Sequence, residues 1–248
     1  MIGLISCSTT KYVGEGQYLL DKVKIKTDTP DVKPADMKSY LQQHPNYKIF
    51  GLFKWPLYVY SWSGSNEKKW LNKQLRRMGE SPVLLDTTLT EQSVIQLERY
   101  MFNRGYTNAQ VEVLTDTVKG KKAVLKYSIK AGEPYRIRTY DSQIDDPTIN
   151  SIIHIETPRR SFLQSLFRAV PREYNSFIRE DMLFDRVVLD KERQRLTTLL
   201  RRHGYYAFNR DYLGYWADTS LLRNHVYLDM YIKHNDYISK RGETKQHR

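Results

Sequence analysis

RYMFNRGYTNAQVEV (Arg99–Val113) and TLLRRHGYYAFNRDY (Thr198–Tyr212) are two similar passages in this chain of 248 residues. Their Gly-Tyr pairs, Gly105-Tyr106 and Gly204-Tyr205, lie 99 residues apart. A spacing of this size is that of a whole structural module rather than of a short motif. The repetition therefore predicts two copies of one module.

Both passages have the pattern of a helix that ends in a glycine cap. The apolar residues before each glycine share the i, i+3, i+4 spacing of one helix face: Leu97, Tyr100 and Met101, then Leu196, Leu199 and Leu200. Glycine follows at the position where a left-handed residue ends a helix, because glycine has no steric penalty at positive φ. We therefore predict that Gly105, Tyr106, Gly204 and Tyr205 are structural cap residues, with each tyrosine packed over the last helical turn.

Alternating segments flank both passages and predict strands. They are Asp21–Lys26 and Ala123–Lys130 around the first passage, and Tyr135–Tyr140 and His225–Lys233 around the second. Weaker patterns predict a helix at Pro34–Gln43 and another at Asp146–His154, the first with proline at a suitable starting position. Each copy thus has the predicted order strand, helix, helix, strand, strand.

Each copy also contains an insertion before its second main helix. The first holds the aromatic stretch Asn46–Gly64 and a predicted helix at Asn66–Gly79, and the second holds Ser161–Phe177. The rings of the first insertion either form a partner surface or pack onto the core of the module. The rings in question are Phe50, Phe53, Trp55, Tyr58 and Tyr60. We favour packing for most of these five, because so many exposed rings would promote aggregation.

The charge balance favours polyanionic partners. The chain carries 40 basic and 28 acidic residues, for a net charge of +12. Arg159–Arg210 holds 12 basic and 6 acidic residues, about half of the excess. Nucleic acid, anionic lipid headgroups and acidic protein faces would all be attracted to such a surface. No RNA-binding aromatic motif or helix-turn-helix spacing is present, so nucleic-acid binding in the cytoplasm is the alternative rather than the favoured function.

The sequence has no pattern typical of an enzyme. It lacks a nucleophile elbow, a Walker loop and a dinucleotide fingerprint, and its histidines do not pair at metal-ligand spacing. No run of 18 apolar residues predicts a membrane-spanning helix. We expect a non-enzymatic protein without a cofactor or metal.

Cys7 is the only cysteine and follows Leu4-Ile5-Ser6 in the order of a bacterial lipoprotein signal. Only six residues precede it, whereas a signal peptide has a basic segment and an apolar stretch of about 7–15 residues. Either Cys7 is the lipid attachment point of a longer precursor, or it is a chance cysteine near an apolar terminus.

The module order, the Gly-Tyr helix ends and the connection IKAGEPYRI (Ile129–Ile137) together resemble POTRA (polypeptide-transport-associated) domains of the BamA/TamA superfamily. STTKYVGEGQYLLDKVKI after the cysteine, NYKIFGLFKWPLYVY and VVLDKERQRLTTLLRRHGYYAF are similar to the lipidated TamA-like (TamL-type) group. Members of that group continue into a membrane barrel, and this chain has no succession of barrel strands. We therefore expect an N-terminal periplasmic fragment of a longer protein.

The resemblance implies an α+β fold of two tandem POTRA-like modules, each a three-stranded mixed sheet with helices on one face. The expected divisions are residues 1–16 (signal remnant and linker), 17–131 (module 1, with the aromatic insertion at 46–82), 132–235 (module 2) and 236–248 (a charged tail or the start of another module).

The resemblance also implies a function and a site. It implies outer-membrane protein assembly or translocation on the periplasmic side of the outer membrane, with a lipid anchor. The expected partners are outer-membrane protein clients and a periplasm-spanning assembly-module subunit, with no nucleic acid. They would bind by β-augmentation at the second strand of each module, Asn108–Leu114 and Tyr206–Leu213. The candidate partner-binding residues are Asn108, Gln110, Glu112, Tyr206, Phe208, Arg210 and Tyr212.

Overall fold

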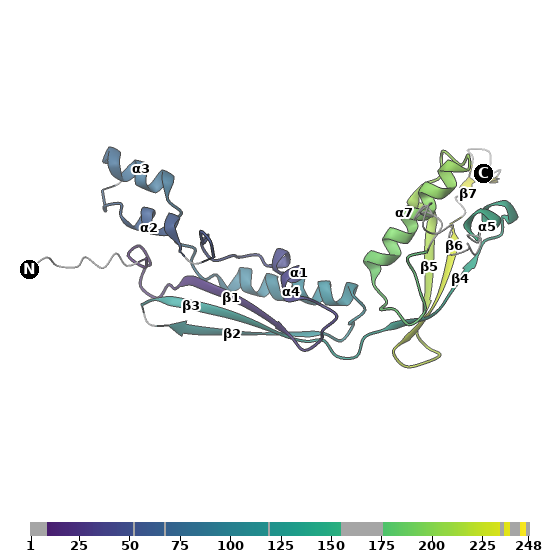
Figure 1. Ribbon diagram of the computed structural model, residues 1–248, viewed down its shortest axis with the longest axis horizontal. Coiled ribbons are helices and arrows are strands. Elements are labelled where there is room, and N and C mark those ends of the chain that lie inside the picture. Colours follow the sequence, from purple (N-terminus) through teal and green to yellow (C-terminus); the bar gives the residue numbers. More distant parts are fainter. Residues whose placement is uncertain are drawn as a thin grey trace, which may run out of the picture. The chain divides into compact units, whose positions relative to one another are not determined.

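The computed structural model describes residues 9–51, 53–66, 68–118, 120–154, 176–233, 236–238 and 244–246. The chain forms two compact units. The first contains the residues up to Met101 together with Asn108–Gly132, and the second contains Phe102–Thr107 and the residues from Glu133 onward. Each unit has its own three-stranded sheet (Figure 1).

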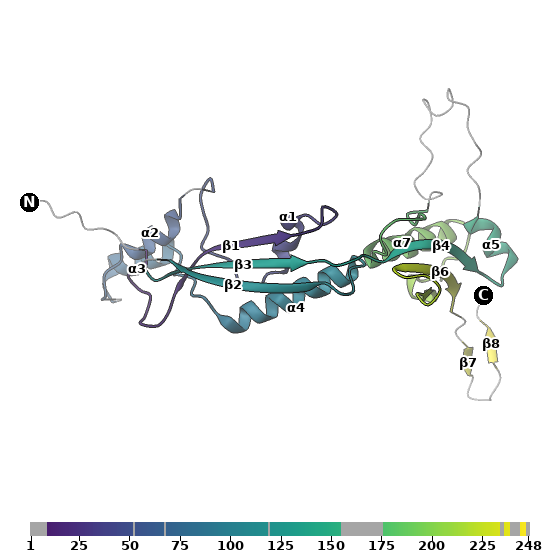
Figure 2. The same cartoon turned by 90° about the horizontal axis from the view of Figure 1, so that it is seen from below.

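The first unit is built on strands β1 (Leu19–Thr27), β2 (Gln110–Val118) and β3 (Lys122–Lys130). The sheet order is β1-β3-β2, with β1 parallel and β2 antiparallel to the central β3, as Figure 2 shows. Along β3, alternate residues are buried: Ala123, Leu125, Tyr127 and Ile129. The residues between them carry polar or charged side chains outward, so only one face of the sheet is covered.

Helices cover that face in the first unit. The long helix α4 (Thr87–Asn103) lies along the sheet (Figure 1) and buries the predicted stripe of Leu97, Tyr100 and Met101. The short helix α1 (Pro34–Met37) and the 3-10 helix η1 (Lys38–Tyr40) precede it. Two further helices, α2 (Trp55–Ser61) and α3 (Trp70–Met78), form the insertion.

The second unit repeats this plan with strands β4 (Arg136–Gln143), β5 (Leu213–Asp218) and β6 (His225–Ile232), in the order β4-β6-β5. Its helices are α5 (Pro147–Ile153), α7 (Arg186–Arg202) and the 3-10 helix η3 (Arg210–Tyr212). The stripe of Leu196, Leu199 and Leu200 on α7 packs with Leu213 and Met230 of the sheet. A separate pair, β7 (Asp236–Ile238) and β8 (Thr244–Gln246), follows.

The predicted fold class is therefore confirmed. The chain is α+β, with two tandem modules of POTRA-like strand order, each a three-stranded mixed sheet with helices on one face. Among the described helices, none has the length and apolar content that crossing a membrane would require.

The repeat extends further back than the Gly-Tyr pairs. Leu84 bridges Leu19 at the start of β1, and Leu183, which lies 99 residues after Leu84, bridges Arg136 at the start of β4. Two residues later, Asp86 and Asp185 each accept hydrogen bonds from the backbone at the start of the long helix. An aspartate in this position satisfies backbone N–H groups that have no partner within the helix.

The two glycines end the long helices. Gly105 lies two residues after α4 with φ 91°, and Gly204 lies two residues after α7 with φ 98°. The Tyr205 N–H donates to the Leu200 carbonyl at 3.1 Å, which closes the end of α7. Tyr106 is almost fully buried, and Tyr205 packs against the cluster that holds Leu200.

Two predicted helices have different boundaries in the structure. The helix expected over Pro34–Gln43 ends as η1 at Tyr40, since Ser93 Oγ accepts a hydrogen bond from the Gln42 N–H (2.9 Å) and holds the chain extended. The helix expected over Asn66–Gly79 begins only at Trp70. Cys7 and most of Ser161–Phe177, including residues 161–175, lie outside the described residues.

Candidate functional site

The edges of the two sheets are candidate binding sites, because edge strands have backbone groups without a partner in the sheet. In the first unit β1 and β2 are the edges, and in the second β4 and β5.

The prediction for the first module falls largely on an edge. Gln110 and Glu112 lie on β2 and are exposed, whereas Asn108 lies in the turn before the strand. The Lys130 Nζ donates to Glu112 Oε1 at 2.5 Å across the helix-free face. The Val111 N–H donates to the Glu98 carboxylate (3.4 Å) rather than to β3, so alternate N–H groups of β2 point out of the sheet.

The prediction for the second module places the strand too early. Strand β5 begins at Leu213, while Tyr206, Phe208, Arg210 and Tyr212 precede it in a turn and in η3. The Phe208 N–H donates to the Tyr205 carbonyl (3.0 Å), and the Phe208 ring is buried against Tyr212. These contacts fold the chain back onto the core, so Phe208 is not available to a partner. Tyr206 is 82% exposed but does not lie on a strand edge.

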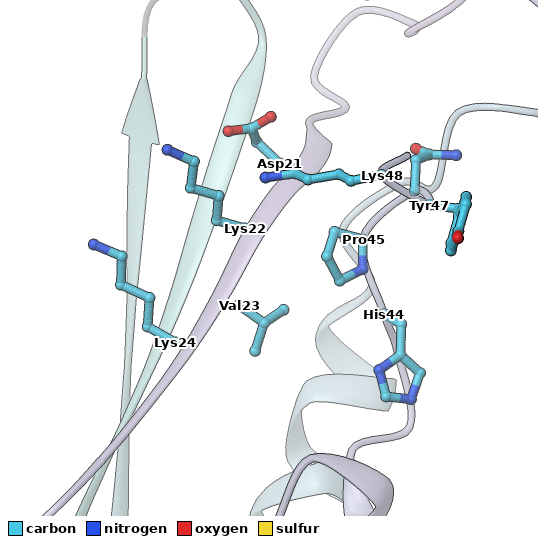
Figure 3. A pocket seen from close by; sticks show the side chains of 9 residues that line it. Asp21, Lys22, Val23, Lys24, His44, Pro45, Tyr47 and Lys48 are labelled. Carbon is cyan, nitrogen blue, oxygen red and sulfur yellow. The ribbon is translucent and has the colours of Figure 1, made fainter. Parts of the chain in front are cut away.

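A groove runs along the free edge of β1 (Figure 3). Two adjoining hollows, of about 480 and 420 Å³, share Val23, Lys24, His44 and Pro45 and therefore form one continuous groove. One wall is β1, and the opposite wall is the extended segment from His44 to Lys48. Figure 3 shows Val23 on the side of β1 toward Pro45 and His44, with Lys22 and Lys24 on the other side.

The backbone of β1 is open in this groove. At its start the edge is already occupied, since the Leu20 N–H donates to the Val83 carbonyl (2.8 Å) and the Leu85 N–H donates to the Tyr18 carbonyl (2.8 Å). At its end the Asp28 N–H donates to the Ile129 carbonyl of β3 (3.3 Å). Because backbone directions alternate along a strand, the N–H and C=O groups of Val23 and Ile25 point away from β3. In the part of the chain that the structure describes, these groups have no backbone partner.

The opposite wall is held in place by side-chain hydrogen bonds. Asn46 is buried, and its amide donates to the Ser81 carbonyl (2.7 Å) and accepts from the Val83 N–H (3.0 Å). Gln43 donates to the Asp86 carbonyl at 2.9 Å. The Tyr47 N–H donates to the Glu80 carboxylate at 2.9 Å. The groove is thus formed before any partner arrives, which reduces the entropy lost on binding.

The lining of the groove is strongly basic. Its lysines are Lys22, Lys24, Lys26, Lys38 and Lys48. The one acidic lining residue, Asp21, accepts a hydrogen bond from the Lys54 Nζ (2.8 Å), and Lys54 also donates to the Asp21 carbonyl (2.9 Å). The positive charge of the lysines is therefore not neutralised by the groove itself and attracts an anionic partner.

The Asp21–Lys54 pair shows how burial and charge compete. Burial alone would raise the pKa of Asp21, but the Lys54 ammonium and the nearby Lys122 and Lys22 more than offset it and lower that pKa. Burial lowers the pKa of Lys54, and its bond to Asp21 only partly compensates. The pair fixes the start of β1 beside the groove.

The described residues contain no cluster of His, Cys, Asp and Glu that could hold a metal ion. Burial raises the pKa of Tyr140 and of Tyr215, so both hydroxyls are protonated at neutral pH. Their rings belong to the core of the second unit, where the Tyr215 hydroxyl donates to the Leu189 carbonyl at 3.4 Å. Both tyrosines are partly buried and pack against the core.

The β1 groove was not predicted from the sequence. The alternation of lysine with Val23 and Ile25 predicted the strand but not which of its edges stays open. The signal that could have indicated the second wall is Pro45, which follows His44 and has no N–H group to pair with a strand. The anchoring role of Asn46 depends on residues more than thirty positions away and has no local signature.

Comparison with known proteins gives matches only among solved structures. No family model matches the chain, and no curated protein does. The POTRA3-5 segment of BamA from Haemophilus influenzae is 12% identical with a TM-score of 0.34, covering 87% of this chain and 61% of that one. BamA from Haemophilus ducreyi lacking POTRA domains 1-3 is 13% identical with a TM-score of 0.36, covering 87% and 29%.

A cyanobacterial structure is similar over nearly its whole length. POTRA1-2 of the periplasmic domain of Omp85 from Anabaena is 9% identical with a TM-score of 0.34, and the match covers 87% of this chain and 96% of that one. The chain thus spans less than two thirds of the two Haemophilus structures, at 61% and 29% of their length.

Proposed function

We propose that this chain is the periplasmic POTRA region of an outer-membrane protein assembly or translocation factor, and that it binds extended segments of clients or of a partner subunit by β-augmentation. The modules would be residues 17–131 and 132–235. The principal site would be the open edge of β1, with the edge of β2 at Gln110 and Glu112 as a further site.

The observation that carries this proposal is the pairing at the start of β1. The segment of the chain from Val83 to Leu85 already pairs antiparallel with this edge, at Leu19 and Leu20. The edge therefore accepts an added strand, and beyond Asp21 the same edge is open and faces a groove. Backbone hydrogen bonds require no particular side chain in the guest, which suits varied clients.

The groove favours an acidic guest. An added strand would align its backbone with Val23 and Ile25, and its outward side chains would meet the row of Lys22, Lys24 and Lys26. These lysines are exposed and have no ion pair among the described residues. Alternating acidic side chains would complement this row.

The test uses the full chain and a fluorescent peptide that alternates glutamate with valine. Its binding is followed by fluorescence anisotropy, with a peptide that alternates lysine with valine as the comparison probe. We expect the acidic peptide to bind and the basic one not to. The double variant K24E/K26E should weaken binding by about tenfold, because two complementary charges become repulsive.

Arg99→Glu is the matched control, because Arg99 is an exposed cation on α4 away from the groove. It should bind the acidic peptide like the unmodified chain. Equal weakening by R99E and K24E/K26E would indicate general electrostatic attraction and would contradict the groove. A nucleic-acid duplex bound more tightly than either peptide would favour the alternative function.

Edge pairing itself is tested with proline. Val23→Pro removes an outward N–H and should abolish peptide binding with a melting temperature close to that of the control Val23→Ala. Lys24→Pro removes a bond to β3 and should unfold the sheet. Unchanged peptide binding by a folded V23P chain would rule out β-augmentation at β1.

A further inference from the structure

The insertion carries the densest group of exposed apolar side chains in the described chain. Its exposed large apolar residues are Tyr47, Phe50, Phe53, Trp55, Tyr58, Trp62, Trp70, Leu71 and Met78. Our expectation that Phe50, Phe53 and Trp55 pack onto the core is therefore wrong, because they are 92%, 65% and 50% exposed. A group of exposed apolar side chains of this density is typical of an interaction site.

Helix α3 turns its apolar face outward. Trp70, Leu71 and Met78 are 73%, 60% and 75% exposed, and their spacing of i, i+1 and i+8 places them on one stripe of the helix. Lys73 and Arg77, also exposed, lie beside this stripe on the side of Trp70. In a helix that packs only on its own protein, the apolar stripe would face the core instead.

Helix α2 and the preceding turn add to this surface. Trp55, Tyr58 and Trp62 form an i, i+3, i+7 stripe, and the rings of Trp55 and Trp62 meet edge to face at 5.3 Å. Before α2, Ile49 and Phe53 form a bridge around the turn that carries Phe50.

Phe50 has two energetically unfavourable features. Its φ is 51°, a left-handed conformation that a phenylalanine rarely adopts, and its ring is 92% exposed. Such strain and exposure at the tip of a turn are typical of functional residues rather than of structural ones.

The inner side of the insertion is well packed, so the outward rings do not reflect a loose structure. Leu57 is fully buried, and the Asn72 amide donates to the Asn66 carbonyl (2.7 Å) and accepts from the Gly64 N–H (2.8 Å). A Cβ at Gly79 would lie 2.4 Å from the Tyr60 backbone nitrogen, so α3 ends in close contact with α2. The insertion therefore holds its outer rings on a well-packed support.

The charges of the insertion indicate what covers these rings. Residues 50–79 contain Lys54, Lys68, Lys69, Lys73, Arg76 and Arg77 but only one acidic residue, Glu67. Lys54 pairs with Asp21, and Arg76 lies over the rings of Tyr12 and Tyr60. The other four cations are exposed, and no ion pair of theirs occurs among the described residues.

We infer that this aromatic and basic surface docks on an anionic phospholipid bilayer. Tryptophan and phenylalanine insert at the level of the headgroups, and lysine and arginine reach the phosphates beside them. Each cation near an anionic surface adds about 1 kcal/mol of attraction, which the exposed Lys68, Lys69, Lys73 and Arg77 would supply. Protein–protein interfaces are enriched in aromatic residues but depleted in lysine, whereas this part of the chain has the exposed lysines Lys68, Lys69 and Lys73 close in sequence to Trp70.

The test is sedimentation of the full chain with unilamellar vesicles of equal parts phosphatidylcholine and phosphatidylglycerol. Tryptophan fluorescence is recorded in parallel, because ring insertion shifts the emission to shorter wavelength. We expect binding to these vesicles and at least about tenfold weaker binding to pure phosphatidylcholine. The double variant W70S/M78S and the single variant F50S should each reduce the bound fraction severalfold, since each removes inserted apolar area.

Trp216→Ser is the matched control, since Trp216 is 68% exposed on β5 in the other unit. It should sediment like the unmodified chain. Wild-type sedimentation by W70S/M78S and F50S, with normal circular dichroism, would overturn the inference. Loss of binding in K68E/K73E but not in W70S/M78S would also overturn it, because that outcome describes charge attraction without insertion. Peptide binding at the β1 groove is independent of both results.

Discussion

Gly105 and Gly204 are equivalent in the repeat but differ in what surrounds them. Both have positive φ, so a Cβ is strained at either. At Gly105 a Cβ would also lie 3.1 Å from the carbonyl oxygens of Phe184 and Tyr135, whereas at Gly204 no atom lies within 4 Å. Gly204→Ala should therefore lower the free energy of unfolding by ~1 kcal/mol, and Gly105→Ala by ~2 kcal/mol or more. Urea denaturation measures both, and equal losses would mean that the contacts at Gly105 relax freely.

Asp21 and Lys54 predict a pH effect at the start of β1. The pKa of Asp21 is lowered below its ordinary value of 3.8, so its ion pair contributes stability at neutral pH that is lost as the pH falls below that value. Asp21→Asn should destabilise the chain by ~2 kcal/mol at pH 7, because it leaves the largely buried Lys54 ammonium without its carboxylate. The difference from the unmodified chain should shrink as the pH is lowered below 3.8. Denaturation curves across this range test the sign, and a difference that grows in acid would contradict it.

At the scale of elements, the two long helices begin with the same device. Asp86 and Asp185 both accept from the first backbone N–H groups, but Asp86 is exposed while Asp185 is buried and also pairs with Arg104 at 2.5 Å. Asp86→Ala should cost ~1 kcal/mol, the usual value of a helix cap. Asp185→Ala should cost ~2–3 kcal/mol, because it also removes a partly buried ion pair. Thermal denaturation of the two single variants compares them directly, and Thr88→Ala, next to the first cap, serves as the control.

The sequence predicted which helices and strands form better than it predicted where they begin and which sheet edges stay open. Helices α4 and α7 were predicted because their apolar spacing and final glycines are local signals. Strand β5 was placed too early. After the glycine, the strand begins five residues on in the first module, at Gln110, but nine residues on in the second, at Leu213. The four extra residues belong to a turn that Phe208 closes by tertiary packing. The groove beside β1 was missed for a similar reason, since Asn46 is held by Ser81 and Val83 through contacts that no local pattern encodes.

The whole molecule has a net charge of +12, so the salt dependence of binding tests whether the proposed partners are held by charge. Binding of the alternating glutamate peptide should weaken by severalfold between low and physiological salt, where the screening length falls to about 8 Å. Unfolding should change far less over the same range, because many ion pairs among the described residues are exposed and contribute little to stability. Anisotropy titrations and melting curves in parallel salt series separate the two effects. Peptide affinity that is independent of salt would contradict a role for the lysine row.

Attachment of the whole protein to a membrane is a separate prediction. If Cys7 carries the lipid, cells that express the full-length gene should incorporate labelled palmitate into the protein, and Cys7→Ser should abolish the label. Serine is the closest substitute in size without a thiol, so folding should be unaffected. Label retained by the C7S protein would assign the lipid to another position or exclude it.

The internal pairing of Val83–Leu85 with β1 would also limit the length and the direction of a guest strand at this edge. This segment and the bulge between Leu20 and Lys22 occupy the first part of the edge, so only Lys22 to Thr27 remain for a guest. A guest antiparallel to β1 would enter beside Thr27 and stop where its end meets Val83, at the Asp21–Lys54 pair. In the proposed β-augmentation, Val83–Leu85 would therefore act as a register stop that prevents a long polypeptide from sliding through the groove. A proposed site of this length would bind one short segment at a time, with an affinity low enough for rapid release.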